Sequence, residues 1–110
     1  MEQQRNVTYA RKCVRHSLSL GEAPFASHLL YTQDGVLDDA NHKQRWQGIL
    51  AGLEWGVCAN ATVVYADYGF SDGMRLGIER AYEAGRTVEY RNIEKPAPLR
   101  GRAHCLNATI

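Results

Sequence analysis

The sequence has little cysteine, no long apolar run and almost no excess charge. Three cysteines, Cys13, Cys58 and Cys105, are scattered over 110 residues, without the pairing of a disulfide framework or a zinc knuckle. Cys13 and Cys58 fall on apolar faces of expected helices, where free cysteine behaves as a small hydrophobic residue. The four histidines lie in separate elements and lack metal-ligand spacing. We therefore expect neither structural disulfides nor a metal site.

Other absences exclude whole classes of function. No run of 18 apolar residues occurs, and the first five residues, MEQQR, lack the apolar segment of a signal peptide. The 13 basic and 12 acidic residues leave a net charge of +1, which is not the pattern of a nucleic-acid or membrane-surface binder. The motifs GxSxG, GxxxxGK[ST] and strand-linked GxGxxG are also absent. We expect a cytoplasmic protein without a bound cofactor that binds neither nucleic acid nor membrane.

Helix-period and strand-period segments alternate along the chain. We expect helices at 3–20, 41–58 and 72–84, and strands at 23–28, 61–66 and 87–91. The run ATVVYA at 61–66 is nearly continuously apolar and contains β-branched residues, as in a strand that is buried on both faces of a parallel sheet. The order predicts an α/β domain, small, three-layered and Rossmann-like, over residues 1–93. The tail, 94–110, is expected either to pair as an edge strand through 105–110 or to be disordered.

The expected binding residues follow two strands, because ligands of open parallel sheets bind beyond the carboxyl ends of the strands. After the first strand come His28, Tyr31 and Gln33, which suit stacking on a flat heterocycle and recognition of its amide groups. A single histidine at such a position is also commonly a structural residue.

The second expected segment is the loop that feeds the helix 72–84. It holds Asp67, Ser71, Gly73 and Met74, and the amides of Gly73 and Met74 at a helix N-terminus favour an anion such as phosphate. The alternative is that Ser71 is only an N-cap and that the glycines only form the turn. We expect the two segments to face one another across a shared pocket.

Several phrases together resemble a known superfamily. Arg5-Asn6-Val7 and Tyr9-Ala10-Arg11 are followed by GEAPFASHLLYTQ, VLDD, ADYGFSDGMRLGIERA and AGRTVEYR. They resemble phage and bacterial proteins related to the nucleoside 2-deoxyribosyltransferases, over roughly residues 5–92. The resemblance implies a small Rossmann-like fold, oligomerisation, and transfer of a deoxyribosyl group between bases through a glutamate nucleophile.

The chain departs from this superfamily in two ways. Relatives begin with a strand and a nucleoside-binding loop, and this chain starts almost at the helix that follows them. The resemblance therefore implies a missing interior strand, replaced by the tail, by a partner subunit or by a domain swap, or a truncated gene product. The nucleophile position, four residues after Gly73, is Gly77. Glu79 lies about 200° around the helix from it and is expected to pair with Arg75.

Three functions are compatible with these residues. The first is a module that binds a nucleoside or nucleotide-derived small molecule without covalent catalysis; in a phage it could sequester a nucleotide signal. The second is an enzyme that cleaves or transfers an N-glycosidic bond, with Asp67, Asp72 or Asp38, or less favourably Glu79, as the catalytic carboxylate. The third is an inert structural protein.

An incomplete sheet also predicts self-association. Its open edges, and apolar faces with Val7, Val14, Trp46 and Leu53, need cover. We expect a homo-oligomer, either a dimer or a multiple of dimers.

Overall fold

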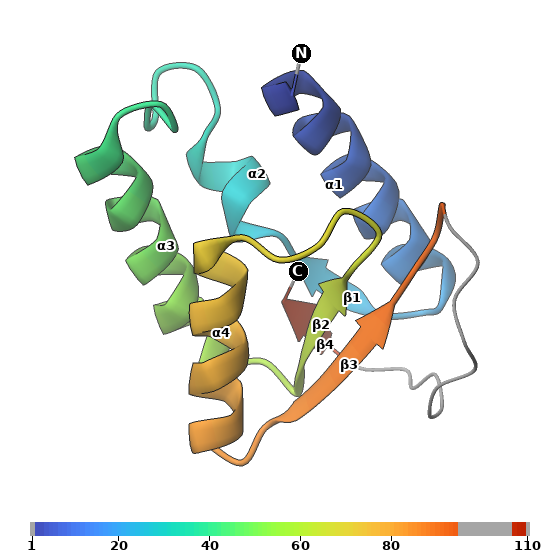
Figure 1. The fold of residues 1–110 in the computed structure, drawn as a ribbon. Helices are drawn as coiled ribbons and strands as arrows, with labels where there is room; N and C mark the ends of the chain where they lie inside the picture. Colours follow the sequence, from blue (N-terminus) through green and yellow to red (C-terminus); the bar gives the residue numbers. More distant parts are fainter. Residues whose placement is uncertain (1, 95–106, 110) are drawn as a thin grey trace.

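A parallel sheet forms the middle layer of the molecule (Figure 1). The computed structural model describes residues 2–94 and 107–109. The sheet has four strands, β1 (Ala23–Phe25), β2 (Ala61–Tyr65), β3 (Thr87–Arg91) and β4 (Asn107–Thr109), in the order β1-β4-β2-β3. All neighbouring strands pair in parallel. Their carboxyl ends therefore lie at one edge of the sheet.

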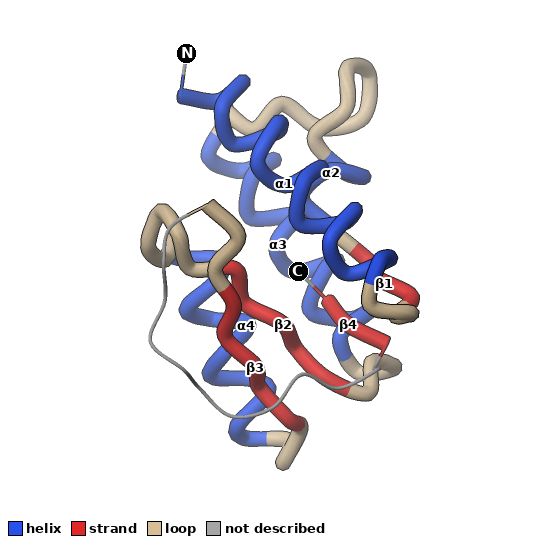
Figure 2. Tube along the Cα trace, turned by 90° about the vertical axis from the view of Figure 1, so that its right-hand side faces the viewer, coloured by secondary structure: helices blue, strands red, loops and turns tan. Residues whose placement is uncertain are grey.

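Helices cover both faces of this sheet (Figure 2). They are α1 (Glu2–Ser19), α2 (Ser27–Tyr31), α3 (His42–Gly56) and α4 (Asp72–Glu83). Helix α1 covers one face, and α3 and α4 pack side by side on the other. Within the described residues, none of these helices combines the length and the apolar character needed to cross a bilayer. The predicted three-layer Rossmann-like α/β domain is confirmed.

Strand β2 is buried on both faces, as its nearly continuous apolar run predicts. Val63 and Tyr65 pack with Cys13 of α1, and Tyr9 and Ile93 border this cluster. Burial raises the pKa of the Cys13 thiol to about 12. Helix α1 is thus held to the sheet by a small apolar core.

The segment 23–28 differs from its prediction as a strand. Only Ala23–Phe25 is extended, and Ser27–Tyr31 forms the short helix α2, so His28 lies on a helix and not at a strand end. Residues 23–31 include no β-branched residue, which disfavours a strand. Leu29 and Leu30 favour helix. Gly52 of α3 also lets this helix approach closely, because a Cβ at Gly52 would lie 2.8 Å from Ser27 Cβ.

The tail contributes an interior strand, and the prediction of an edge strand at 105–110 is wrong. Residues 107–109 pair with β1 on one side and β2 on the other. The two flanking strands are too far apart to pair with each other, and β4 fills the gap between them. Of the implied replacements for a missing strand, the tail therefore supplies it in this structure.

The cysteines divide between interior and surface. Cys13 is 1% exposed, as expected. Cys58 is exposed, contrary to the prediction of an apolar face, because α3 ends at Gly56. Cys105 lies outside the described residues.

Candidate functional site

The loop after β2 leads into a well-capped helix. Ser71 Oγ accepts a hydrogen bond from the Met74 backbone N–H at 3.2 Å, and Met74 Sδ accepts one from the Ser71 N–H at 3.4 Å. Asp72 is exposed on the first turn, where a negative charge interacts favourably with the helix dipole. Gly69 has φ +83°, a conformation that favours glycine. The cap interpretation of Ser71 is therefore correct, and the remaining N–H groups of the first turn are left to solvent or a ligand.

Asp67 is buried and heavily hydrogen-bonded. It is 4% exposed, and its Oδ2 accepts from Tyr9 Oη at 2.5 Å and from the Ile93 N–H at 2.9 Å. Its Oδ1 accepts from the Glu94 N–H at 3.0 Å and from Asn92 Nδ2 at 3.4 Å. The carboxylate thus ties α1 to the loop after β3. These four bonds assign it a structural role and leave little capacity for catalysis.

The α2 segment is built around Tyr31. Its hydroxyl accepts a hydrogen bond from Trp55 Nε1 on α3 at 2.8 Å. His28 Nε2 lies 3.4 Å from Asp39 Oδ2, so the histidine contacts the following loop. Gln33 is exposed and donates from Nε2 to the Leu30 carbonyl at 2.9 Å. Tyr31 is therefore fixed to α3, whereas the Gln33 amide bonds within its own turn.

Both predicted segments pack on one turn of α3. A Cβ at Gly48 would lie 3.6 Å from Tyr31 Cβ. A Cβ at Gly73, in the first turn of α4, would lie 3.1 Å from Ile49 Cδ1. Because Gly48 and Ile49 are adjacent, Tyr31 and Gly73 lie near the same level of α3. Figure 1 places α2 and the loop after β2 at the same end of the sheet.

A hollow of about 400 Å³ lies beside the α2 segment. It is lined by Thr32, the loop 34–39 and Gln44 at the start of α3. Of the expected carboxylates it contains Asp38, whose Oδ1 accepts from the Ala40 N–H at 2.9 Å. Asp67 and the 71–74 segment are not part of this hollow. In the described residues no three histidine, cysteine or acidic side chains gather as metal ligands would.

Gly77, which occupies the position of the nucleophile that the resemblance implies, lies on α4 where this helix faces α3. A Cβ at Gly77 would meet Leu53 Cδ2 of α3 at 3.9 Å. Glu79 is exposed, and within the described part of the chain the ion pair on α4 joins Arg80 to Glu83 at 3.9 Å. The expected pairing of Glu79 with Arg75 is therefore wrong. Neither position presents a carboxylate to the carboxyl end of β2.

Replacing Gly77 with alanine is expected to stabilise the protein by about 1 kcal/mol, since alanine favours helix over glycine by that amount. The added methyl would make an ordinary contact with Leu53. Urea unfolding followed by circular dichroism measures the change. Gly52→Ala is the opposite control, because its Cβ would lie 2.4 Å from Ser27 Oγ and should destabilise. Loss of stability in Gly77→Ala would contradict this packing.

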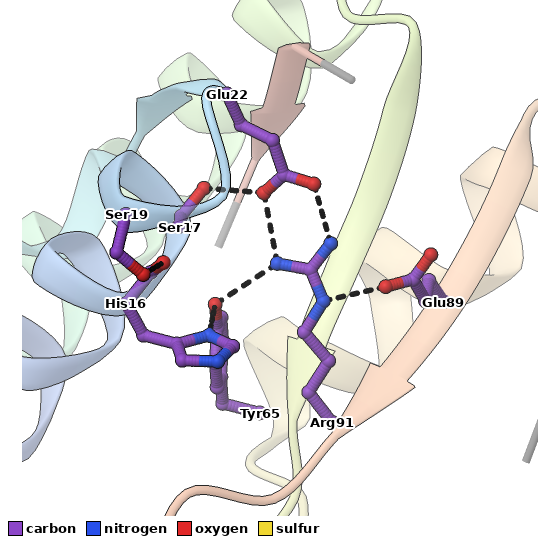
Figure 3. Close-up of polar contacts among 7 residues, drawn as sticks. All are labelled: His16, Ser17, Ser19, Glu22, Tyr65, Glu89 and Arg91. Atoms are coloured by element: carbon purple, nitrogen blue, oxygen red, sulfur yellow. Dashed lines mark hydrogen bonds and ion pairs between the residues drawn. The ribbon is translucent and has the colours of Figure 1, made fainter. Parts of the chain in front are cut away.

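A buried ionic network lies on the α1 side of the sheet (Figure 3). Arg91 Nη2 lies 2.6 Å from Glu22 Oε2, and Arg91 Nη1 lies 2.8 Å from Glu22 Oε1. Their side chains are 7% and 0% exposed. Arg91 Nε also donates to Glu89 Oε2 at 2.5 Å. These contacts raise the pKa of Arg91 despite its burial, so the guanidinium stays charged.

The network extends to α1 and β2. Ser17 Oγ donates to Glu22 Oε1 at 2.6 Å, and Arg91 Nη1 donates to the Tyr65 hydroxyl at 3.0 Å. Tyr65 in turn lies 2.9 Å from His16 Nδ1. Sequence reasoning missed this cluster. The available signal was the spacing of Glu89 and Arg91, because residues two apart on a strand share a face.

Comparison with known proteins identifies a family but not a function. No curated protein sequence and no solved structure gives a significant match to the chain. One family model, described as a domain of unknown function (DUF7768), matches residues 2–91. This match covers α1 through β3, the elements that carry both the candidate segments and the ionic network. The chain therefore belongs to the DUF7768 family.

Proposed function

We propose that this protein binds a nucleoside or nucleotide-derived small molecule in the cytoplasm, at the carboxyl ends of its strands. The observation that carries the proposal is the packing of Tyr31 and Gly73 on adjacent residues of α3. It brings the end of α2 and the N-terminus of α4 to one end of a Rossmann-like sheet, where such folds bind ligands. The resemblance to nucleoside 2-deoxyribosyltransferases supports the choice of ligand class.

The carboxylates favour binding over covalent catalysis. The position expected for the nucleophile is Gly77, and its neighbour is a leucine. Asp67 accepts four hydrogen bonds that hold the fold together. Glu79 is exposed on α4. A nucleophile must lie close to the anomeric carbon with a free oxygen, and none of these residues meets both conditions.

The ligand would stack on Tyr31 and hydrogen-bond to Gln33 and the first turn of α4. Gln33 is suited to this because it is exposed and, among the described residues, its side-chain amide bonds to the Leu30 carbonyl alone. An amide can both donate to and accept from the edge of a base. Ser71 and Met74 use their own N–H groups in the cap of α4, so Gly73 supplies the backbone N–H for the ligand at the helix start. His28 lies on α2, in the same segment as Tyr31.

Isothermal titration of the full chain with deoxynucleosides, nucleoside monophosphates and NAD tests the proposal, with chromatography of the same mixtures. We expect saturable binding of at least one compound without release of free base. Gln33→Ala should weaken binding about tenfold, which corresponds to about 1.4 kcal/mol. Glu79→Gln is the matched control and should bind normally.

Two results would reject binding without catalysis. Absence of binding across the whole panel would reject the ligand class. Release of free base that Asp72→Asn abolishes would instead establish the enzyme, because Asp72 is exposed at the start of α4.

A further inference from the structure

The position of β4 makes it a separable part of the fold. Its Cα partners are Ala23–Phe25 on β1, and Ala61 and Thr62 on β2. Strand β1 pairs with β4, so β4 is its backbone link to the rest of the sheet. If β4 left, both neighbours would expose unpaired N–H and C=O groups along an interior gap. This gap is a slot that fits one short parallel strand.

The rest of the molecule is joined by contacts that do not involve β4. Strands β2 and β3 pair over five residues each. Helix α1 is held to β2 by the cluster of Cys13, Val63 and Tyr65. Helices α3 and α4 pack on each other, and α4 packs on β2 and β3. A body with an open slot can therefore persist while the strand that fills it is exchanged.

To place β4 between its own β1 and β2, the chain must reverse its direction along the sheet after β3. From β1 to β2 to β3 the chain moves in one direction along the sheet, with α3 and α4 on a single face. A connection back from β3 to β4 reverses this direction, so a right-handed crossover would have to run over the opposite face. That face is the one that α1 covers (Figure 2). Residues 92–106 separate β3 from β4 in the sequence, and an extended segment of this length is long enough to reach a neighbouring molecule.

We propose that β4 is exchanged reciprocally between two copies of the chain, so that each copy's slot holds residues 107–109 of the other. The backbone pairs are the same whichever copy supplies the strand, and exchange of an identical element is a low-cost route to a dimer. Exchange also brings two bodies together that carry exposed apolar side chains. Leu18, Leu50 and Val57 are 57%, 52% and 74% exposed in the single chain.

Disulfide trapping in the full chain tests the exchange. Ala23 and Asn107 are Cα partners, and adjacent strands lie about 4.8 Å apart, within the range of a disulfide. In a background of Cys58→Ser and Cys105→Ser, we expect the Ala23→Cys/Asn107→Cys variant to oxidise to a covalent dimer on non-reducing gels. The unmodified chain should show twice the 12.3 kDa monomer mass by light scattering.

The control tests the register of the slot. Ala23→Cys/Thr109→Cys places the second cysteine two residues away, since Thr109 is the partner of Phe25, and it should link poorly. A disulfide within one chain, or a chain that is monomeric at micromolar concentration, would overturn the exchange. Absence of any disulfide in the Ala23→Cys/Asn107→Cys variant would overturn it as well. Residue 107 pairs with residue 23 whether β4 comes from the same chain or from the other copy.

Discussion

Replacing Arg91 with methionine is expected to lower the free energy of unfolding by about 3–5 kcal/mol, the usual cost of breaking a buried ion pair. The loss is large because the guanidinium lies between Glu22 and Glu89. Without it, both carboxylates lose the guanidinium that joins them in the interior. Domains of this size are stable by only about 5–15 kcal/mol, so the variant should unfold at much lower urea concentration.

Two further variants separate the buried pair from a general loss of charge. Arg80→Met removes an exposed partner of Glu83 and should change stability by less than about 0.5 kcal/mol. Glu22→Leu/Arg91→Met removes both charges of the bidentate pair and should recover part of the loss, because an apolar pair avoids their desolvation. Equal stability of Arg91→Met and Arg80→Met would show that the network contributes little.

The parts of the fold that follow from local pattern were predictable. The apolar run at 61–66 contains the buried strand β2, and 87–91 forms a strand as expected. Ser71 caps α4, and Asn41 caps α3 by accepting from the Gln44 N–H at 3.0 Å. In each case the signal lies within a few residues of the element that it predicts.

The remaining features depend on contacts distant in sequence. The change from strand to helix at Ser27 depends on Gly52, which allows α2 to approach α3 closely. The interior position of residues 107–109 depends on the gap between β1 and β2. The pairing of Glu22 with Arg91 joins residues 69 positions apart. No local periodicity encodes such pairs, so a single sequence does not reveal them.

The site shows the same division. Sequence pattern selected the loop after β2 and the segment around Tyr31, and a ligand pocket shared by the two segments stays a prediction. The pattern assigned Asp67 to ligand binding or catalysis, because an aspartate after a buried strand is equally typical of both roles. The structure shows its four hydrogen bonds to Tyr9 and the loop after β3. Only the three-dimensional contacts distinguish a ligand-binding carboxylate from one that holds two elements together.

The last prediction tests this assignment of Asp67. Asp67→Ala is expected to lower the free energy of unfolding by about 3 kcal/mol, because each buried donor without an acceptor costs about 1–3 kcal/mol. The stranded donors are the Tyr9 hydroxyl and the backbone N–H groups of Ile93 and Glu94. Chemical denaturation of both proteins at pH 7 measures the difference.

Tyr9→Phe provides the matched comparison, since it removes one donor and leaves the Asp67 carboxylate in place. It should cost about 1 kcal/mol. The Tyr9→Phe/Asp67→Ala double variant should lose less than the sum of the single losses, because the two groups share one hydrogen bond. The hydroxyl also accepts from the Asp67 N–H at 3.2 Å, so part of its contribution persists in Asp67→Ala. If Asp67→Ala instead kept full stability and lost nucleoside binding, the carboxylate would belong to the ligand site and the structural assignment would be wrong.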